Sequence, residues 1–145
     1  MKIPPFRIGF IYLSFLLTSV APKPGARDMA EAKLVRLVSA EMRVPEGEAR
    51  ALLALASVRE AAETLALAER AHIGACLAEE HADAALRAAR AALPYDMAEG
   101  DEMRVYREAL EMHTSARALV TSARALSAVS RSRLRAACAP PADAS

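Results

Sequence analysis

The sequence predicts an all-α protein: a long antiparallel helical hairpin, coiled-coil-like with an alanine-rich seam, and a shorter N-terminal helix packed on it. Three observations lead to this fold class. Hydrophobic residues make up 54% of the 145-residue chain but aromatic residues only 4%, and alanine, the strongest helix former, supplies much of the difference. Two long stretches carry apolar residues at intervals of seven. Every proline lies outside the expected helices or at the first residue of one.

Residues 1–27 differ in kind from the rest of the chain. Lys2 and Arg7 precede an apolar run over 8–21, and a proline-rich linker follows. The run is long enough for the hydrophobic core of a secretory signal and too short to cross a bilayer. We therefore expect a signal or signal-anchor segment that attaches the protein to a membrane through residues 8–21 or exports it to the cell envelope. The alternatives are a buried core segment and a true start at Met29, which would make the protein cytoplasmic.

Three helices are expected over 28–138, the hairpin domain. The first begins at a capping box formed by Asp28 and Glu31 and ends near Arg43, because the residue before a proline avoids the α region. The second runs from Pro45 to Leu93.

Gly74 is the one candidate position for a kink in the second helix. The third helix begins at a capping box over 96–99 or at Gly100-Asp101 and continues to about Ala137. Residues 139–145 are expected to be a disordered tail.

A seam of small residues follows the second helix. Alanine recurs at every seventh position, at Ala54, Ala61, Ala68, Ala75, Ala82 and Ala89. Three residues after each of these come Ser57, Thr64, Ala71, Ala78, Ala85 and Ala92. A period of seven is typical of a left-handed coiled coil. The competing explanation is that alanine is simply abundant in this chain.

The third helix has the same period but larger residues. Those residues are Val105, Met112, Leu119 and Leu126, interleaved with Ala109, Ala116 and Ala123. The six residues Thr114–Leu119 are repeated without change at Thr121–Leu126. A chain reversal near residue 97 places the large residues opposite Ala89, Ala82, Ala75 and Ala68, and a reversal near residue 95 places them opposite Ala85, Ala78, Ala71 and Thr64. Either register predicts large residues packed against small ones.

Charge supports the same pairing. The net charge of +1 gives no global reason to expect nucleic acid or a membrane surface. Residues 113–142 contain no acid but carry Arg117, Arg124, Arg131, Arg133 and Arg135. The facing stretch 60–83 carries Glu60, Glu63, Glu69, Glu79, Glu80 and Asp83. We interpret the arginines as partners of these acids; because the run has no aromatic residue for base stacking, nucleic-acid binding is not expected.

One metal site can be assembled from the sequence. Glu69 and His72 form a Glu-x-x-His motif on one helix face, although di-iron bundles use two such motifs. His81 and His113 face each other if the chain reverses near residue 97. These four residues are the candidate ligands for Zn²⁺, Ni²⁺ or Cu²⁺. The competing interpretation is a pair of solvent-facing histidines.

No catalytic motif is present in the chain. We find no nucleophile–base pair, phosphate-binding loop or Cys-x-x-Cys, so we expect no enzyme and no cofactor. Cys76 and Cys138 would lie far apart in the hairpin, so no bridge within one chain is expected.

These patterns predict a non-enzymatic structural or protein–protein interaction protein. It would associate with itself or with a larger assembly through an apolar stripe on the second helix, formed by Leu52, Leu55, Val58, Leu65 and Ile73. The alternative is a metal-binding sensor or chaperone-like helical protein of the cell envelope.

Overall fold

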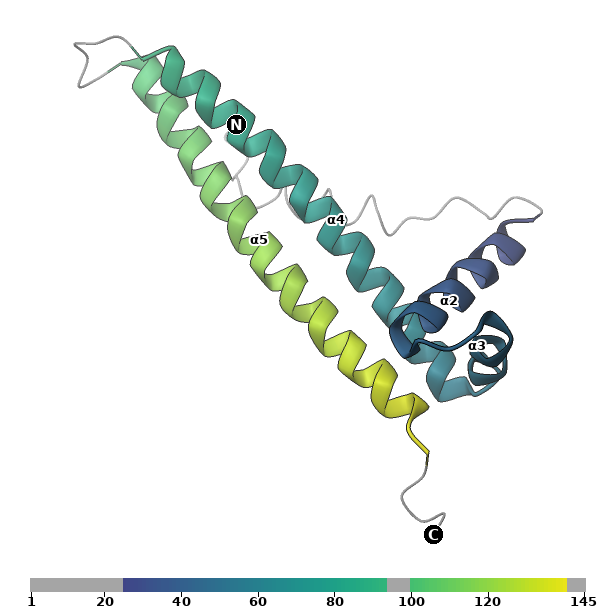
Figure 1. The fold of residues 1–145 in the computed structure, drawn as a ribbon. Helices are drawn as coiled ribbons and strands as arrows, with labels where there is room; N and C mark the ends of the chain where they lie inside the picture. Colours follow the sequence, from purple (N-terminus) through teal and green to yellow (C-terminus); the bar gives the residue numbers. More distant parts are fainter. Residues whose placement is uncertain (1–24, 94–99, 141–145) are drawn as a thin grey trace, which may run out of the picture. The chain divides into compact units, whose positions relative to one another are not determined.

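The structure is a computed structural model that describes residues 25–93 and 100–140. These residues form four helices and no strand: α2 (Ala26–Met42), α3 (Glu46–Leu53), α4 (Ala56–Ala91) and α5 (Asp101–Cys138) (Figure 1). The all-α prediction is confirmed. The predicted apolar run, the reversal of the chain and most of the tail lie outside the described residues. None of the described helices is long and apolar enough to cross a membrane.

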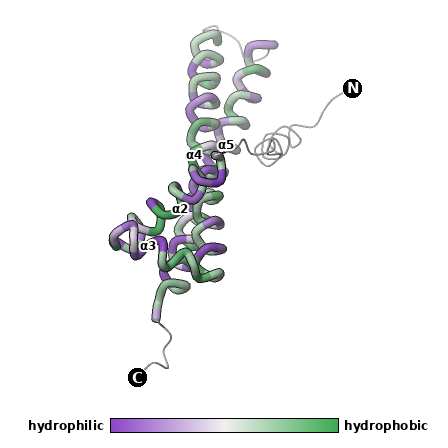
Figure 2. Tube along the Cα trace, turned by 90° about the vertical axis from the view of Figure 1, so that its right-hand side faces the viewer, coloured by the Kyte–Doolittle hydropathy of each residue, from purple (hydrophilic) through white to green (hydrophobic). Residues whose placement is uncertain are grey.

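The long helices α4 and α5 form the predicted antiparallel hairpin and lie side by side along their length (Figure 1). They contain 36 and 38 residues, which at about 1.5 Å a residue gives more than about 50 Å each. Polar and apolar residues alternate in short bands along both helices (Figure 2). Such banding is typical of helices that bury a narrow seam.

The alanine row of the predicted seam on α4 is confirmed from its third member onward, but the companion row three residues later is wrong, because Ser57, Ala78, Ala85 and Ala92 are exposed. Ala68, Ala75, Ala82 and Ala89 are 2–7% exposed. The facing helix α5 buries mainly small residues, namely Ala109, Ala116, Val120, Ala123, Ser127, Ser130 and Leu134. The hairpin is therefore held over most of its length by small residues packed on small residues.

The predicted large-on-small packing between α4 and α5 is wrong. Val105, Met112, Leu119 and Leu126 are 46–59% exposed, and the alanines interleaved with them face α4 instead. Alanine on both sides lets the two backbones approach closely, so that each helix gains contact with its neighbour's main chain.

The register also differs by a small amount from the predicted one. His113 pairs with Asp83 and Arg117 with Glu79. Both pairs are symmetric about position 98, one residue beyond the first predicted reversal point. A rotation of α5 accompanies this shift and turns its large residues outward.

The predicted second helix is interrupted near its start and continuous where a kink was expected. Leu55 is extended, with φ −78° and ψ 124°, and separates α3 from α4, whereas α4 passes through Gly74 without a break. The interruption lets Ala49 and Leu53 become fully buried. Ala54 lies at the break and is exposed, so it takes no part in the seam.

The base of the hairpin holds the larger apolar residues. We describe it within Leu34–Ser145, one of the two units of the chain. The second half of α2 from Leu34, the helix α3 and the adjoining ends of α4 and α5 enclose a core of Leu34, Val35, Val38, Ala49, Leu53, Val58, Ala62, Leu65 and Leu134. This packing confirms that a shorter N-terminal helix lies on the hairpin.

The predicted docking stripe on the second expected helix is wrong, because the base core buries part of it. Val58 and Leu65 are fully buried in this core and Leu52 packs against it, whereas Leu55 and Ile73 are 54% and 61% exposed. Because residues of α2 and α3 cover Val58 and Leu65, the five residues do not form one exposed stripe.

The helix α2 begins slightly earlier than predicted and ends in a tight turn. The helix begins at Ala26, two residues before the predicted cap, and ends at Met42. Arg43 has a left-handed φ of 56°, and the Ser39 hydroxyl donates a hydrogen bond of 2.6 Å to the Val44 carbonyl. This local bond satisfies a carbonyl at the turn into Pro45.

The two copies of the six-residue repeat occupy equivalent places in α5. Thr114 Oγ1 donates to the Leu110 carbonyl at 2.8 Å, and Thr121 Oγ1 donates to the Arg117 carbonyl at 3.0 Å. Both hydroxyls thus find their hydrogen-bond acceptor in the main chain of their own helix.

Candidate functional site

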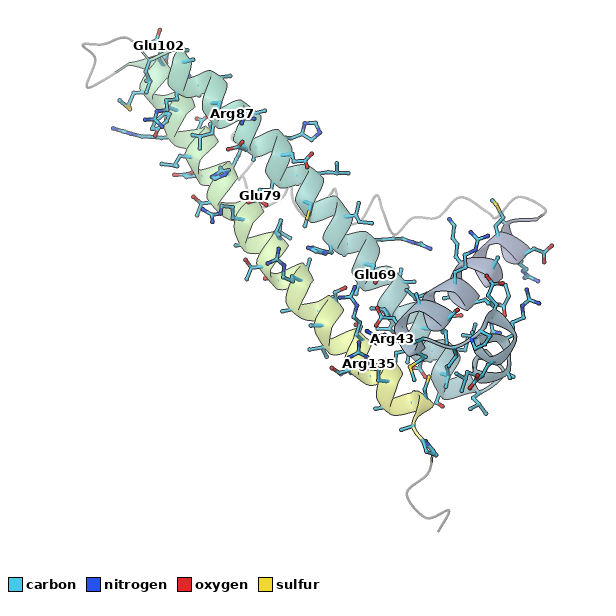
Figure 3. The ribbon with its side chains drawn as sticks, viewed as in Figure 1. Arg43, Glu69, Glu79, Arg87, Glu102 and Arg135 are labelled. Carbon is cyan, nitrogen blue, oxygen red and sulfur yellow. The ribbon has the colours of Figure 1, made fainter. Side chains whose placement is uncertain are left out.

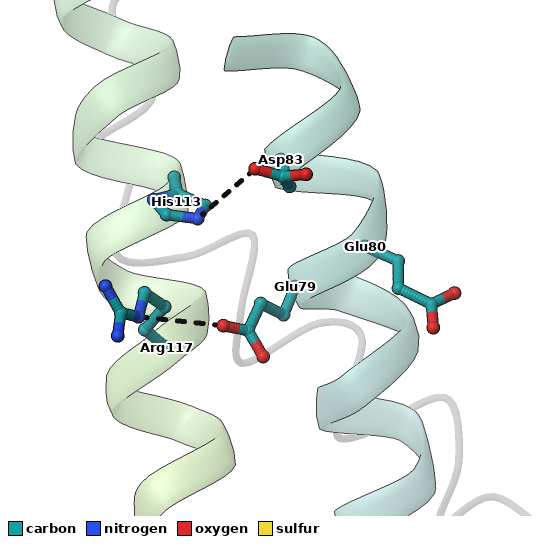
Figure 4. Close-up of a pocket in the computed structure, with 5 residues that line it drawn as sticks. All are labelled: Glu79, Glu80, Asp83, His113 and Arg117. Atoms are coloured by element: carbon teal, nitrogen blue, oxygen red, sulfur yellow. Dashed lines mark ion pairs between the residues drawn. The ribbon is translucent and has the colours of Figure 1, made fainter. Parts of the chain in front are cut away.

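A groove crosses the middle of the hairpin between α4 and α5. It is lined by Glu79, Glu80 and Asp83 of α4 and by His113 and Arg117 of α5 (Figure 4). His113 Nε2 lies 3.7 Å from Asp83 Oδ1, and Arg117 Nε lies 3.7 Å from Glu79 Oε1. Because these residues follow one another at intervals of four on each helix, they form two successive side-chain pairs across the seam.

Four of the five groove residues are engaged with a partner across the seam. Asp83 also accepts an ion pair from Arg87 at 3.1 Å on its own helix, and Glu80 points away from α5 (Figure 4). The five lining residues include no serine, threonine or cysteine that could act as a nucleophile. Their pairing joins the two helices across the seam.

The candidate metal ligands are not gathered into one site. His81 is exposed and does not line the groove, and Glu69 Oε1 accepts a hydrogen bond from Arg131. His72 has a buried Nε2 without a hydrogen-bond partner, and His113 pairs with Asp83 rather than with His81. Across residues 25–93 and 100–140, no group of three or more His, Cys, Asp and Glu side chains is arranged to hold a metal ion. Metal binding therefore stays a prediction.

A second charged cluster lies at the base and joins three helices. Arg131 donates from Nε to Glu41 Oε1 at 2.9 Å and from Nη2 to Glu69 Oε1 at 3.0 Å, and Arg135 Nη2 lies 3.4 Å from Glu41 Oε2. Figure 3 shows Glu69 and Arg135 on the facing long helices. The hydrogen bond to Glu69, helped by Glu41, raises the pKa of Arg131 against the opposing effect of burial.

The predicted pairing of arginines with the acids of 60–83 is confirmed at Arg117 and Arg131. The partner Glu41 was not predicted. It lies 90 residues from Arg131 in the chain, and no periodicity in the sequence connects α2 to α5.

The cysteines are both free thiols. Cys76 packs beside Ala75, Val120 and Ala123 in the seam, and Cys138 packs against the base core. Burial raises the pKa of the Cys138 thiol.

Among the described residues, the α4–α5 ion pairs lie on one side of the seam and none lies on the other. On α4, Asp83 follows the seam residue Ala82 by one position and lies to one side of it, whereas Ala78 and Ala85 lie to the other side. On α5, Arg117 follows Ala116 on the ion-paired side, and Leu119 lies on the opposite side. Because the ion pairs bring the Asp83 side of α4 next to the Arg117 side of α5, the opposite sides of the two helices also lie next to each other. Together they form a second face of the hairpin. On α4 this face consists of Thr64, Ala71, Ala78 and Ala85, with Leu67, Gly74, His81 and Ala88 interleaved between them.

On α5 the second face is a row of exposed residues at alternating intervals of three and four, which we call the outer row. Its members are Val105, Glu108, Met112, Ser115, Leu119, Ser122, Leu126, Val129, Arg133 and Ala136, all exposed. This spacing is that of a coiled-coil seam. The sequence signal for it was the seven-residue period of the large residues, which was first assigned to the contact with α4.

No protein-family model, curated protein or solved structure matches this chain.

Proposed function

We propose that the protein is a non-enzymatic structural protein whose hairpin associates with itself or with a larger assembly. The observation that carries this proposal is the outer row of α5. Its five large apolar residues, Val105, Met112, Leu119, Leu126 and Val129, are 46–59% exposed at coiled-coil spacing. Isolated exposed apolar residues are normal on protein surfaces, but an aligned row indicates an interaction site.

The remaining side chains support a structural role. Four of the five groove residues and the base cluster are engaged in pairs that join helices. Hydrogen-bonded arginines of this kind leave fewer free charges for an anionic ligand.

The alternative proposal is a metal-binding protein of the cell envelope. It is favoured by the position of His113, whose side chain is 19% exposed beside Asp83 and near Glu79. A calorimetric titration with Zn²⁺ tests it: a site of one imidazole and carboxylates would be lost in His113→Ala but retained in His81→Ala.

The interaction function is tested in extracts of cells that make the protein naturally. By size-exclusion chromatography with antibody detection, we expect the wild-type chain in a species larger than the monomer. Leu119→Lys places a charge in the outer row and should return the chain to the monomer size.

Leu110→Lys is the matched control, because Leu110 is 43% exposed on the same helix but lies outside the outer row. It should leave the larger species intact. Elution of the wild-type chain as a monomer, or equal effects of the two lysines, would contradict the proposal.

A further inference from the structure

We propose that a second copy of this chain occupies the outer row, so that two α5 helices pair antiparallel and two hairpins form a four-helix bundle. This inference rests on the proposed function and specifies its partner.

The outer row is complementary to its own reversed copy. Its intervals of three and four read the same from both ends, so the row coincides with its reverse about a point midway between Leu119 and Ser122. Antiparallel pairing about this point places Leu119 against Ser122 of the second copy, Leu126 against Ser115, Met112 against Val129, and Val105 against Ala136. Each of these layers joins a larger side chain to a smaller one, as interdigitated packing requires.

The one remaining layer joins opposite charges. It places Glu108 of one copy against Arg133 of the other, and the two-fold axis creates this pair twice. Both residues are exposed, and neither forms an ion pair with another described residue. Parallel pairing would instead bring Glu108 against Glu108 and Arg133 against Arg133. Charged residues within and beside a coiled-coil seam set its orientation in this way.

The rest of the hairpin leaves room for this partner. The helix α2 reaches α5 through Arg131 and Arg135, on the side of the ion pairs. At the same spacing, the second face of α4 carries Thr64, Leu67, Ala71, Gly74, Ala78, His81, Ala85 and Ala88. Most of these residues are small and none is an acid, a lysine or an arginine, which would let the two α4 helices approach and close the bundle. A symmetric dimer needs one patch that is complementary to itself, and the outer row has this property in size and in charge.

Cysteine cross-linking of the full chain tests the arrangement. In a Cys76→Ala/Cys138→Ala background, Met112→Cys/Val129→Cys should give a disulfide-linked dimer under oxidised glutathione. The two positions are about 25 Å apart along one straight helix, so they cannot bridge within a chain.

The single variant Met112→Cys distinguishes the two orientations. It should stay monomeric on non-reducing electrophoresis, because its predicted neighbour in the second copy is Val129. A cross-linked dimer of the single variant would indicate parallel pairing and overturn the proposal, as would a double variant that does not cross-link.

A charge exchange provides an independent test. Glu108→Arg and Arg133→Glu should each weaken the dimer about tenfold in sedimentation equilibrium, since each substitution creates two like-charge contacts. The double variant Glu108→Arg/Arg133→Glu should restore wild-type dissociation. Every variant retains residues 8–21, so association through that segment would be equal in all of them; equal dissociation constants for all four chains would overturn the pairing.

Failure of this inference is separable from failure of the proposed function. A purified full chain that stays monomeric at all concentrations overturns the second copy as partner. If the larger species in cell extracts still depends on Leu119, the proposed function stands with a different protein as partner.

Discussion

The base of the hairpin and its arm, which is the part of α4 and α5 beyond the base core, are held by different contacts. The base supplies most of the stability, whereas the arm supplies the exposed apolar surface. The base buries Leu53, Leu65 and Leu134 completely, whereas the arm buries alanines such as Ala75 and Ala116, 6–7% exposed. Each buried methylene contributes about 0.8 kcal/mol, so a base residue contributes far more than an arm residue. The base therefore fixes the fold, and the arm keeps its large residues for the outer row.

The largest expected effect comes from truncating the base. Leu65→Ala removes a fully buried side chain and should lower the free energy of unfolding by about 2–5 kcal/mol. Leu77→Ala is the matched control, since Leu77 lies on the same helix and is 51% exposed in the arm; it should change the value by less than about 1 kcal/mol. Urea denaturation followed by circular dichroism measures both, and similar losses would show that the arm contributes as much as the base.

Overpacking the arm should have the next largest effect. Ala82 is 4% exposed in the seam, and Ala82→Leu should cost about 1–3 kcal/mol because α5 lies too close to accommodate the added atoms. The exposed Ala84 offers the control, and Ala84→Leu should change little since the helix propensities of the two residues are similar. Thermal melts at one protein concentration compare the two. Equal melting temperatures would contradict the close approach of α4 and α5.

The ion pairs of the base should contribute less than its apolar core. Arg131→Met removes the bonds to Glu41 and Glu69 and should cost about 1 kcal/mol, because the Arg131 side chain is 42% exposed. The loss should shrink in high salt. Arg124→Met serves as control, because Arg124 forms no ion pair with any described residue; urea midpoints that match in the two variants would argue against a stabilising role for the cluster.

The smallest effect concerns the Cys138 thiol at the base. Burial raises its pKa in the folded protein, so its contribution to stability is complete below the pKa of the unfolded thiol and is lost as pH rises through the folded value. We expect slow alkylation of Cys138 by iodoacetamide at pH 8 in the folded chain and faster alkylation in urea. Mass spectrometry of the labelled peptide measures both rates, and fast labelling of the folded chain would show that the thiol is not protected.

The sequence predicted the elements of this fold better than their contacts. The ends of α5 and the alanines of α4 followed from caps, prolines and a seven-residue period, all of which act locally. The period of Val105 and Leu119 was also read correctly, but a period does not say which of two faces a neighbour occupies. The ion pairs at His113, Arg117 and Arg131 fix that choice, because they depend on both helices together.

The base was harder to predict because it depends on residues far apart in the chain. No local signal marked the break at Leu55, which is driven by the burial of Leu53. The pairing of Glu41 with Arg131 likewise required the position of α2. The pair of His81 and His113 was chosen for a register that differs slightly from the observed one, and so small a shift is enough to exchange His81 for Asp83 opposite His113.

The repeated six residues in α5 make the length of the arm independent of its packing. The two copies occupy equivalent positions in the helix, with Thr114 and Thr121 bonded alike. Adding or removing one seven-residue unit in both long helices would change the arm by about 10 Å while returning every side chain to the same face. The distance between the base and the tip can therefore change in steps of seven residues only if α4 and α5 change together, because a duplication within the repeat alone would lengthen α5 and leave α4 unchanged.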